Sequence, residues 1–145
     1  MNRVPNSVLS EIEIVIRLLL AAGLGAFVGF QRETAGKSAG VRTLALISLG
    51  SALFTVISVS AFNGADTARI AANVVTGIGF LGAGAIMRRE EGAIEGMTTA
   101  ATIWAVAAIG IATGSGLYLI SIVTALVVFG LLLLPHSNHK GSNRK

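Results

Sequence analysis

The feature that most constrains this chain is an uncharged apolar run, IAANVVTGIGFLGAGAIM, which lies between Arg69 and Arg88. Similar runs recur along the 145 residues. A stretch of about 20 apolar residues matches a hydrocarbon layer roughly 30 Å thick. Because lipid offers no hydrogen-bond partner to the backbone, each run is expected to be helical. The recurrence therefore predicts a multi-spanning membrane protein rather than a soluble domain.

Composition supports this class and excludes others. The mean hydropathy is +0.78, and only 12% of the residues are charged. The sequence has no cysteine, which excludes disulfides and thiolate metal sites. The net charge of +4 comes from basic residues between and after the apolar runs, where such residues orient membrane proteins. Membrane lipids are therefore expected partners, and nucleic acid is not.

The chain is expected to be an all-α membrane protein, a bundle of five transmembrane helices. Residues 1–134 form this domain, and residues 135–145 form a flexible polar cytoplasmic tail. The fourth span is short, since sixteen residues rise only about 24 Å. It could instead join the fifth span as one broken element. The expected spans are 8–30, 42–62, 68–87, 98–113 and 117–134.

The distribution of basic residues favours five crossings over four. With four crossings the basic tail would change sides, and the charge bias would vanish. Five crossings leave only Arg3 and Arg69 flanking the second side, with Arg17 inside the first run. The positive-inside rule then predicts that the N-terminus is outside and the C-terminus is cytoplasmic. The basic residues that share the cytoplasmic side are Arg32, Lys37, Arg42, Arg88, Arg89, Lys140, Arg144 and Lys145.

The third span contains GIGFLG, which matches a dinucleotide-binding fingerprint letter for letter. That motif needs a strand before it and an acidic residue about 20 positions later, which a membrane span does not supply. We instead expect close helix packing, because small residues let helix backbones approach in lipid. Gly25 and Gly29, and Gly110 and Gly114, offer similar faces on the first and fourth spans. The third span would be the central, most enclosed helix, packed through Gly77, Gly79, Gly82 and Gly84.

Polar side chains in or beside the spans are candidate sites, and each has a structural alternative. Glu13 and Arg17, four residues apart, can pair at the outer interface or face a polar cavity. Glu33 and Arg42 lie in a solvated loop or pair in a structured cap. Asn73 is expected to form interhelical hydrogen bonds or to line a polar pathway. The same two interpretations apply to Ser48, Ser51, Thr55, Thr76, Thr99 and Thr102.

Helix caps and metal ligands can also be assigned from the residue types. Asp66 and Thr98 stand where helix N-caps belong. Asp66 and Glu13 could together bind Mg²⁺ weakly on the outer face, because hard cations accept oxygen ligands. No other metal or cofactor is expected. No span carries an acidic residue near its centre, which argues against a proton or cation carrier. Trp104 lies in the middle of a span and is expected to pack inside the bundle.

Four collinear segments together resemble the transmembrane domain of the MgtC/SapB family of bacterial inner-membrane proteins. They cover most of the chain. The resemblance implies a multi-pass bacterial inner-membrane protein with five helices and an outside N-terminus. Many members add a cytoplasmic C-terminal domain. The segments are RLLLAAGLGAFVGFQRE (17–33), GVRTLALISLGSALFTVIS (40–58), ARIAANVVTGIGFLGAGAIM (68–87) and GMTTAATIWAVAAIGIATGSGLY (96–118).

The resemblance also implies a function that is not enzymatic. Its members are associated with growth at low Mg²⁺, with stress adaptation and with survival inside host cells, that is, virulence. Some are linked to restraint of the membrane ATP synthase, so ATP synthase, another membrane protein or a second copy of the chain is an expected partner. The alternative is an ion or small-solute transporter or channel. Gln31 stands where the family usually has an acid. The polar signature of the family falls on Glu13, Arg17, Arg32, Glu33, Arg42, Thr43, Arg69, Asn73, Thr98 and Thr99.

Overall fold

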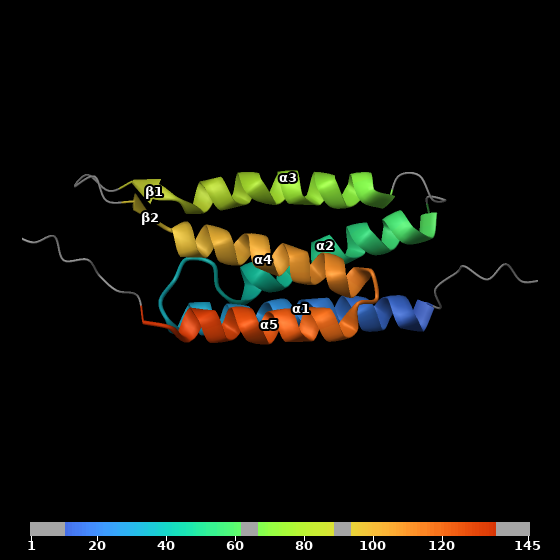
Figure 1. Ribbon diagram of the computed structural model, residues 1–145, viewed down its shortest axis with the longest axis horizontal. Helices are drawn as coiled ribbons and strands as arrows, with labels where there is room; N and C mark the ends of the chain where they lie inside the picture. Colours follow the sequence, from blue (N-terminus) through green and yellow to red (C-terminus); the bar gives the residue numbers. More distant parts are fainter. Residues whose placement is uncertain (1–10, 62–66, 89–93, 136–145) are drawn as a thin grey trace, which may run out of the picture.

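Five helices run back and forth along one long axis in the computed structural model, which describes residues 11–61, 67–88 and 94–135 (Figure 1). A short antiparallel pair of strands joins the third and fourth helices, with Met87 opposite Glu95. The elements are α1 (Glu11–Thr34), α2 (Val41–Ala61), α3 (Thr67–Ala85), β1 (Met87–Arg88), β2 (Ile94–Glu95), α4 (Met97–Gly114) and α5 (Tyr118–Leu133).

The prediction of an all-helical membrane fold is confirmed at this level. Four of the described helices, α1 to α4, are long and apolar enough to cross a membrane, and α5 is a shorter apolar helix. The fourth and fifth spans are separate helices rather than one broken element, because the chain reverses at Gly116, where φ is +82°. The strand pair was not predicted. Of the expected polar tail, only Pro135 lies within the described residues.

The alternating helices give the bundle two ends, which we call the Arg17 end and the Arg32 end after two residues of α1. The α4–α5 turn lies at the Arg17 end, on the right of Figure 1. The α1–α2 connection, the strand pair and the end of α5 lie at the Arg32 end, on the left. Lys37 and Arg42 therefore share an end with Arg32, as the charge pattern predicted.

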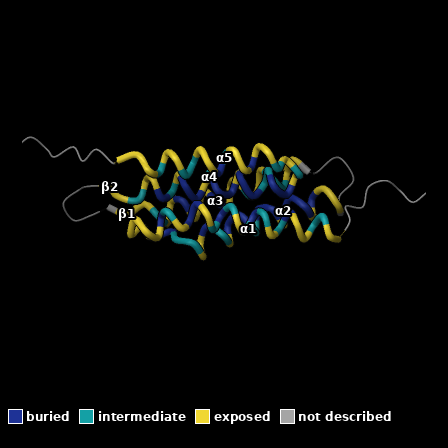
Figure 2. Tube along the Cα trace, turned by 90° about the horizontal axis from the view of Figure 1, so that it is seen from below, coloured by how far each residue is buried: buried dark blue, intermediate teal, exposed yellow. Residues whose placement is uncertain are grey.

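The centre of the bundle is built where α2 meets α1 and α4, and Figure 2 shows the buried positions gathered there. One face of α2 is small and buried. A Cβ added to Gly114 would lie 2.6 Å from the carbonyl oxygen of Ala52, and one added to Gly25 would lie 2.8 Å from the Cβ of Ser48. The expected small-residue faces of α1 and α4 therefore do pack against a neighbour. The buried residues of the α2 face are Ser48, Ser51, Ala52, Thr55 and Ser58.

The prediction that the third span is the central helix is wrong. Helix α3 lies along one edge of the bundle, and most of its residues are exposed (Figures 1 and 2). Gly77, Gly79 and Gly84 have no atom of another part of the chain within 4 Å of a Cβ position. Only Gly82 meets a neighbour, the Cβ of Ala100, at 3.7 Å. Glycine permits close approach, but the rotation of α3 turns most of its glycines away from α2 and α4.

The hydroxyl groups mostly bond within their own helices, so interhelical hydrogen bonding is not their main role. Thr55, Thr76 and Thr102 each donate to the carbonyl oxygen four residues earlier. Thr99 is an exception, because it accepts a bond from α1. Trp104 is 55% exposed, so the expectation that it packs inside the bundle is also wrong for the single chain.

The glycine contacts predict which substitutions disturb the fold. A methyl group at Gly110 would fall on the carbonyl oxygen of Ser48, so α2 and α4 must separate. We expect Gly110→Ala to destabilise the bundle by about 1–3 kcal/mol, as overpacking does. Gly79→Ala meets open space and should leave the melting temperature in detergent unchanged or raise it slightly, because alanine favours helix. Equal melting temperatures for both variants would contradict the close α2–α4 contact.

Candidate functional site

Each end of the bundle contains one buried arginine of α1. Arg17 is 7% exposed and Arg32 is 4% exposed. In the part of the chain that the structure describes, they are the only charged side chains that are buried. A charge removed from water must be paired and hydrogen-bonded to be tolerated, so the partners of the two guanidinium groups decide what each does.

Arg17 has partners for all three of its nitrogen atoms. Nη2 lies 2.5 Å from Glu13 Oε1, Nη1 donates to the carbonyl oxygen of Gly114 at 2.6 Å, and Nε donates to the hydroxyl of Tyr118 at 3.2 Å. The Gly114 carbonyl is at the C-terminus of α4, where the helix dipole favours a cation. The predicted Glu13–Arg17 pair is therefore present, but the guanidinium does more than pair with Glu13 at the end of the helix. It fastens α1 to the α4–α5 turn.

Sequence reasoning missed Gly114 and Tyr118 as partners of Arg17. One signal could have found them. With five crossings, the turn at 113–116 and the start of the first span lie on the same side of the membrane. A buried arginine near one of them has the free carbonyls of the other within reach.

Arg32 is less completely satisfied. Its Nη2 donates to Thr99 Oγ1 at 2.5 Å, but its buried Nε has no hydrogen-bond partner. No carboxylate among the described residues lies within ion-pair distance of it. Its neighbour Gln31 donates from Nε2 to the carbonyl oxygen of Leu132 at 3.0 Å, which ties the end of α5 to α1, while the Gln31 Oε1 atom is buried without a partner.

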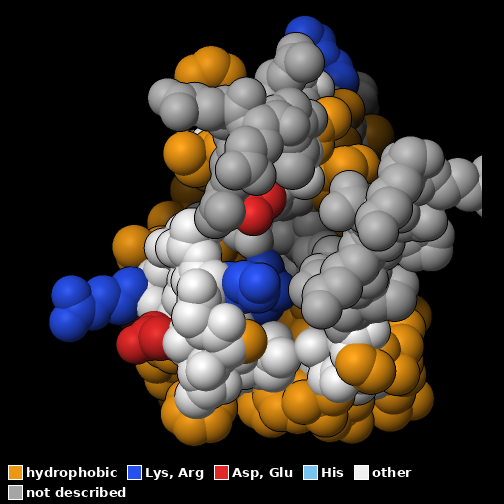
Figure 3. All heavy atoms as spheres, turned by 90° about the vertical axis from the view of Figure 1, so that its left-hand side faces the viewer, with side chains coloured by type: hydrophobic (Ala, Val, Ile, Leu, Met, Phe, Trp, Pro, Cys, Tyr) orange, Lys and Arg blue, Asp and Glu red, His pale blue; other side chains and the backbone are white. Residues whose placement is uncertain are grey.

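A large cavity opens beside Arg32, with a volume of about 1250 Å³. Figure 3 views this end of the molecule and shows a basic patch at its middle, with an acidic patch close to it. The cavity is bounded by α1, the α1–α2 connection, the strand pair, the start of α4 and the end of α5. Its polar lining residues are Gln31, Arg32, Lys37, Ser38, Glu95, Thr98 and Thr99.

The α1–α2 connection is a structured cap, but not the predicted one. Glu33 Oε2 accepts a hydrogen bond from the backbone N–H of Val41 at 3.0 Å, so the carboxylate caps the N-terminus of α2. A Cβ at Gly40 would lie 2.7 Å from that oxygen, so a larger residue there would make the end of the Glu33 side chain shift. Arg42 is exposed and forms no ion pair with Glu33, both of which are described residues. The predicted Glu33–Arg42 pair is wrong because the free N–H groups of α2 are nearer.

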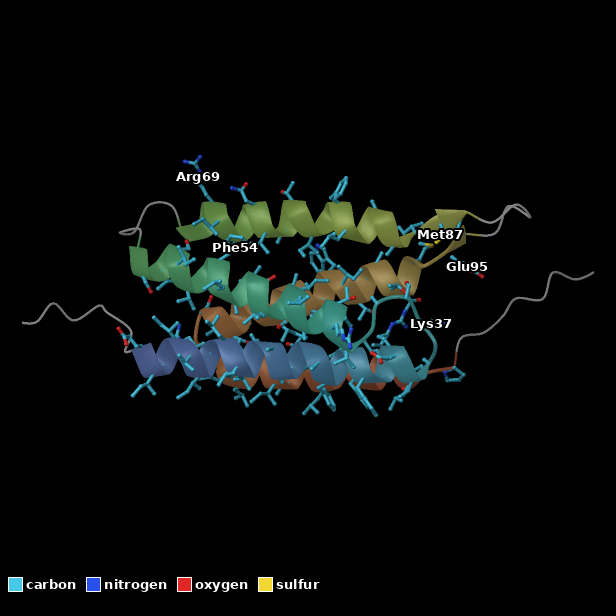
Figure 4. All side chains as sticks on the ribbon, turned by 180° about the vertical axis from the view of Figure 1, so that it is seen from behind. Lys37, Phe54, Arg69, Met87 and Glu95 are labelled. Carbon is cyan, nitrogen blue, oxygen red and sulfur yellow. The ribbon has the colours of Figure 1, made fainter. Side chains whose placement is uncertain are left out.

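The polar candidates on α3 lie apart from this cluster. Arg69 projects away from the bundle near the Arg17 end, whereas Lys37 lies at the Arg32 end (Figure 4). Asn73 is exposed and lines a groove of about 650 Å³ between α2 and α3, together with Phe54 and Ser51. The candidates therefore form separate groups at the two ends, as the sequence predicted, and not one site.

The remaining candidates have mixed outcomes. Thr98 is exposed in the first turn of α4, and the N-cap position belongs to Gly96, whose φ of +90° needs glycine, so the predicted Thr98 cap is wrong. Thr43 is exposed at the start of α2. Asp66 lies outside the described residues, and so does the proposed Asp66–Glu13 site for Mg²⁺. Within the described ranges, no group of three or more His, Cys, Asp or Glu side chains could hold a metal ion.

The observed cap changes what substitutions of Glu33 and Arg42 should do. Glu33→Ala removes the acceptor for the Val41 N–H, so we expect a loss of stability of about 0.5–2 kcal/mol, as for other N-caps. Arg42→Ala should be nearly neutral, and the two effects should add within about 0.5 kcal/mol in a double-mutant cycle. A coupling well above that value, measured from melting curves in detergent, would restore the direct pair.

Comparison with known proteins agrees with this architecture. The MgtC family model matches residues 18–140. The Escherichia coli protein named "Putative magnesium transporter YhiD" is 46% identical over 132 residues, which cover 86% of this chain and 61% of that protein. Protein MgtC of Salmonella typhimurium is 40% identical over 114 residues, which cover 79% of this chain and 48% of that protein.

Protein SapB of Bacillus subtilis is 35% identical over 114 residues, which cover 73% of this chain and 49% of that protein. The chain therefore spans only about half to three-fifths of the length of these relatives. No solved structure matches it. The family match covers most of the helical bundle, including Arg32 and the cavity beside it, and the chain belongs to the MgtC family.

Proposed function

We propose that this chain is a non-enzymatic, multi-pass protein of the bacterial inner membrane that serves adaptation to low Mg²⁺ or to stress. The observation that carries the proposal is membership of the MgtC family, together with the magnesium in the name of the Escherichia coli relative. We further propose that it acts through other membrane proteins, with ATP synthase as one candidate, or as an oligomer.

The interior of the bundle supports action through partners rather than transport of Mg²⁺. The buried charges of the described residues are both arginines, which repel a cation, whereas Mg²⁺ needs oxygen ligands. The buried hydroxyls of α2 do not surround an open path, because they face glycines of α1 and α4 at close contact. Asn73 and Thr76, the other candidates for a pathway, are exposed on α3.

The exposed face of α3 is the surface that a partner helix would meet. Within the described residues, nothing lies within 4 Å of a Cβ position at Gly77, Gly79 or Gly84, and Phe80 beside them is 82% exposed. Small residues let a second helix approach closely in lipid, where packing drives association. A helix of ATP synthase, of another membrane protein or of a second copy of this chain fits this requirement.

The second candidate function is transport of an ion or small solute. It is favoured by the transporter name of the Escherichia coli relative and by the cavity at the Arg32 end. The two functions are distinguished by flux through the purified protein.

Growth and flux together test the proposed function. Deleting the encoding gene should slow growth at limiting Mg²⁺, and the wild-type chain should restore it. Purified protein in proteoliposomes should give no Mg²⁺ flux above empty vesicles. Gly79→Leu should abolish the restored growth without lowering the melting temperature, because its side chain enters open space on the partner surface.

Gly130→Leu on α5 is the matched control, since Gly130 also has no neighbour within 4 Å. It should restore growth like the wild type. Saturable Mg²⁺ flux would replace the proposal with the transporter function. Restored growth with both leucine variants would show that the partner does not bind at α3.

Five crossings with a cytoplasmic Arg32 end can be tested by labelling. The sequence has no cysteine, so single cysteines report without background. Lys37 and Ser115 are both exposed and lie in turns at opposite ends. With Lys37→Cys and Ser115→Cys, a membrane-impermeant thiol reagent added to intact cells should label position 115 and spare position 37. The reverse pattern would invert the topology.

A further inference from the structure

The unpaired charge of Arg32 calls for an explanation that the helix packing does not supply. Its side chain is 4% exposed, and among the described residues its only hydrogen-bond partner is the hydroxyl of Thr99, which leaves the Nε–H unpaired. A buried cation with no counter-ion, as Arg32 is within the described ranges, is unfavourable. Arg17, by contrast, has a partner for each of its three nitrogen atoms. The two arginines therefore differ in whether a guanidinium nitrogen is left without a hydrogen-bond partner among the described residues.

Arg32 lines the cavity at the Arg32 end, and a second source of positive potential meets it there. Helix α4 begins at the cavity, and no side chain caps its first turn, because Gly96 occupies the N-cap position. The N-terminus of an 18-residue helix carries a partial positive charge and attracts anions. The hydroxyls of Thr98 and Thr99, on the same turn, line the same space.

The charged lining residues are mainly basic. Arg32 and Lys37 contribute two cations, and Glu95 is the one carboxylate among the described lining residues. Glu95 lies on the strand pair at the outer edge of this end, beyond the start of α4 (Figure 4). The inner part of the cavity therefore combines a guanidinium, a helix N-terminus and hydroxyl groups, the combination by which proteins hold phosphate.

We propose that this cavity binds a phosphate-type oxyanion, with Arg32 as its principal ligand and the first turn of α4 and Lys37 as supports. The lining also includes the apolar side chains of Leu131, Leu132 and Met97, so it can accept the apolar part of a larger ligand. The phosphate group can belong to a free phosphate compound or to an anionic lipid headgroup. The inference does not depend on the proposed function or on the topology.

The first arm of the test uses inorganic phosphate with the purified full chain in an uncharged maltoside detergent. Phosphate is titrated against chloride at equal ionic strength, and the melting temperature is followed. We expect a saturable rise for the wild type and its loss in Arg32→Gln. The matched control is Arg42→Gln, which removes the same charge at the same end from an exposed residue outside the cavity lining. It should respond like the wild type.

The second arm uses short-chain phosphatidylglycerol in place of inorganic phosphate. Saturation with phosphate identifies a free phosphate ligand, and saturation with the lipid alone identifies a headgroup. Either result supports the site if Arg32→Gln abolishes it. Because phosphate also stabilises proteins by exclusion from their surface, an equal and unsaturable rise in all variants would overturn the proposal. No response of the wild type to either probe would overturn it as well.

A further variant keeps the test decisive if Arg32→Gln does not fold. Lys37 is exposed, so Lys37→Gln should leave the melting temperature without anion unchanged. Because Lys37 lines the cavity, the variant should raise the half-saturating concentration of the probe that binds. An unchanged half-saturating concentration in Lys37→Gln, together with an unfolded Arg32→Gln, would assign Arg32 a purely structural role and overturn the proposal.

Discussion

The close approach of α2 to α1 and α4 is the contact on which the rest of the bundle depends. Lipid tails are as apolar as leucine, so helices in a membrane gain little from burying apolar surface and associate through packing. Here a small-residue face of α2, with Ser48 and Ala52, lies against Gly25, Gly110 and Gly114 at distances that leave no room for a Cβ. Helices α3 and α5 are then placed on the outside of this centre (Figure 2).

Two buried arginines give the two ends of this bundle different properties. Arg17 is saturated by Glu13, Gly114 and Tyr118, so it joins three segments of the chain and has little capacity left for a ligand. Arg32 has one partner among the described side chains, Thr99, and lies beside a large cavity. The same residue type on the same helix thus closes one end and leaves an available charge at the other.

The outer face of α3 differs in chemistry from the Arg32 end. Helix α3 presents glycines and Phe80 outward, where a second helix can pack, and the Arg32 end presents a cationic hollow. A member of the MgtC family that acts on other membrane proteins would use the first surface for contact. The second offers a place where a small anion or lipid headgroup could change that contact.

The sequence by itself determined the class, the helix boundaries to within a few residues, the Glu13–Arg17 pair and the separation of polar groups into two ends. These depend on hydropathy, helix periodicity and charge, which are local properties. Only the tertiary structure decided that the α3 glycines face outward, that Glu33 caps α2 instead of pairing with Arg42, and that Arg32 faces a cavity. Each of these depends on how a helix is rotated against its neighbours, and contacts between residues far apart in the chain set that rotation.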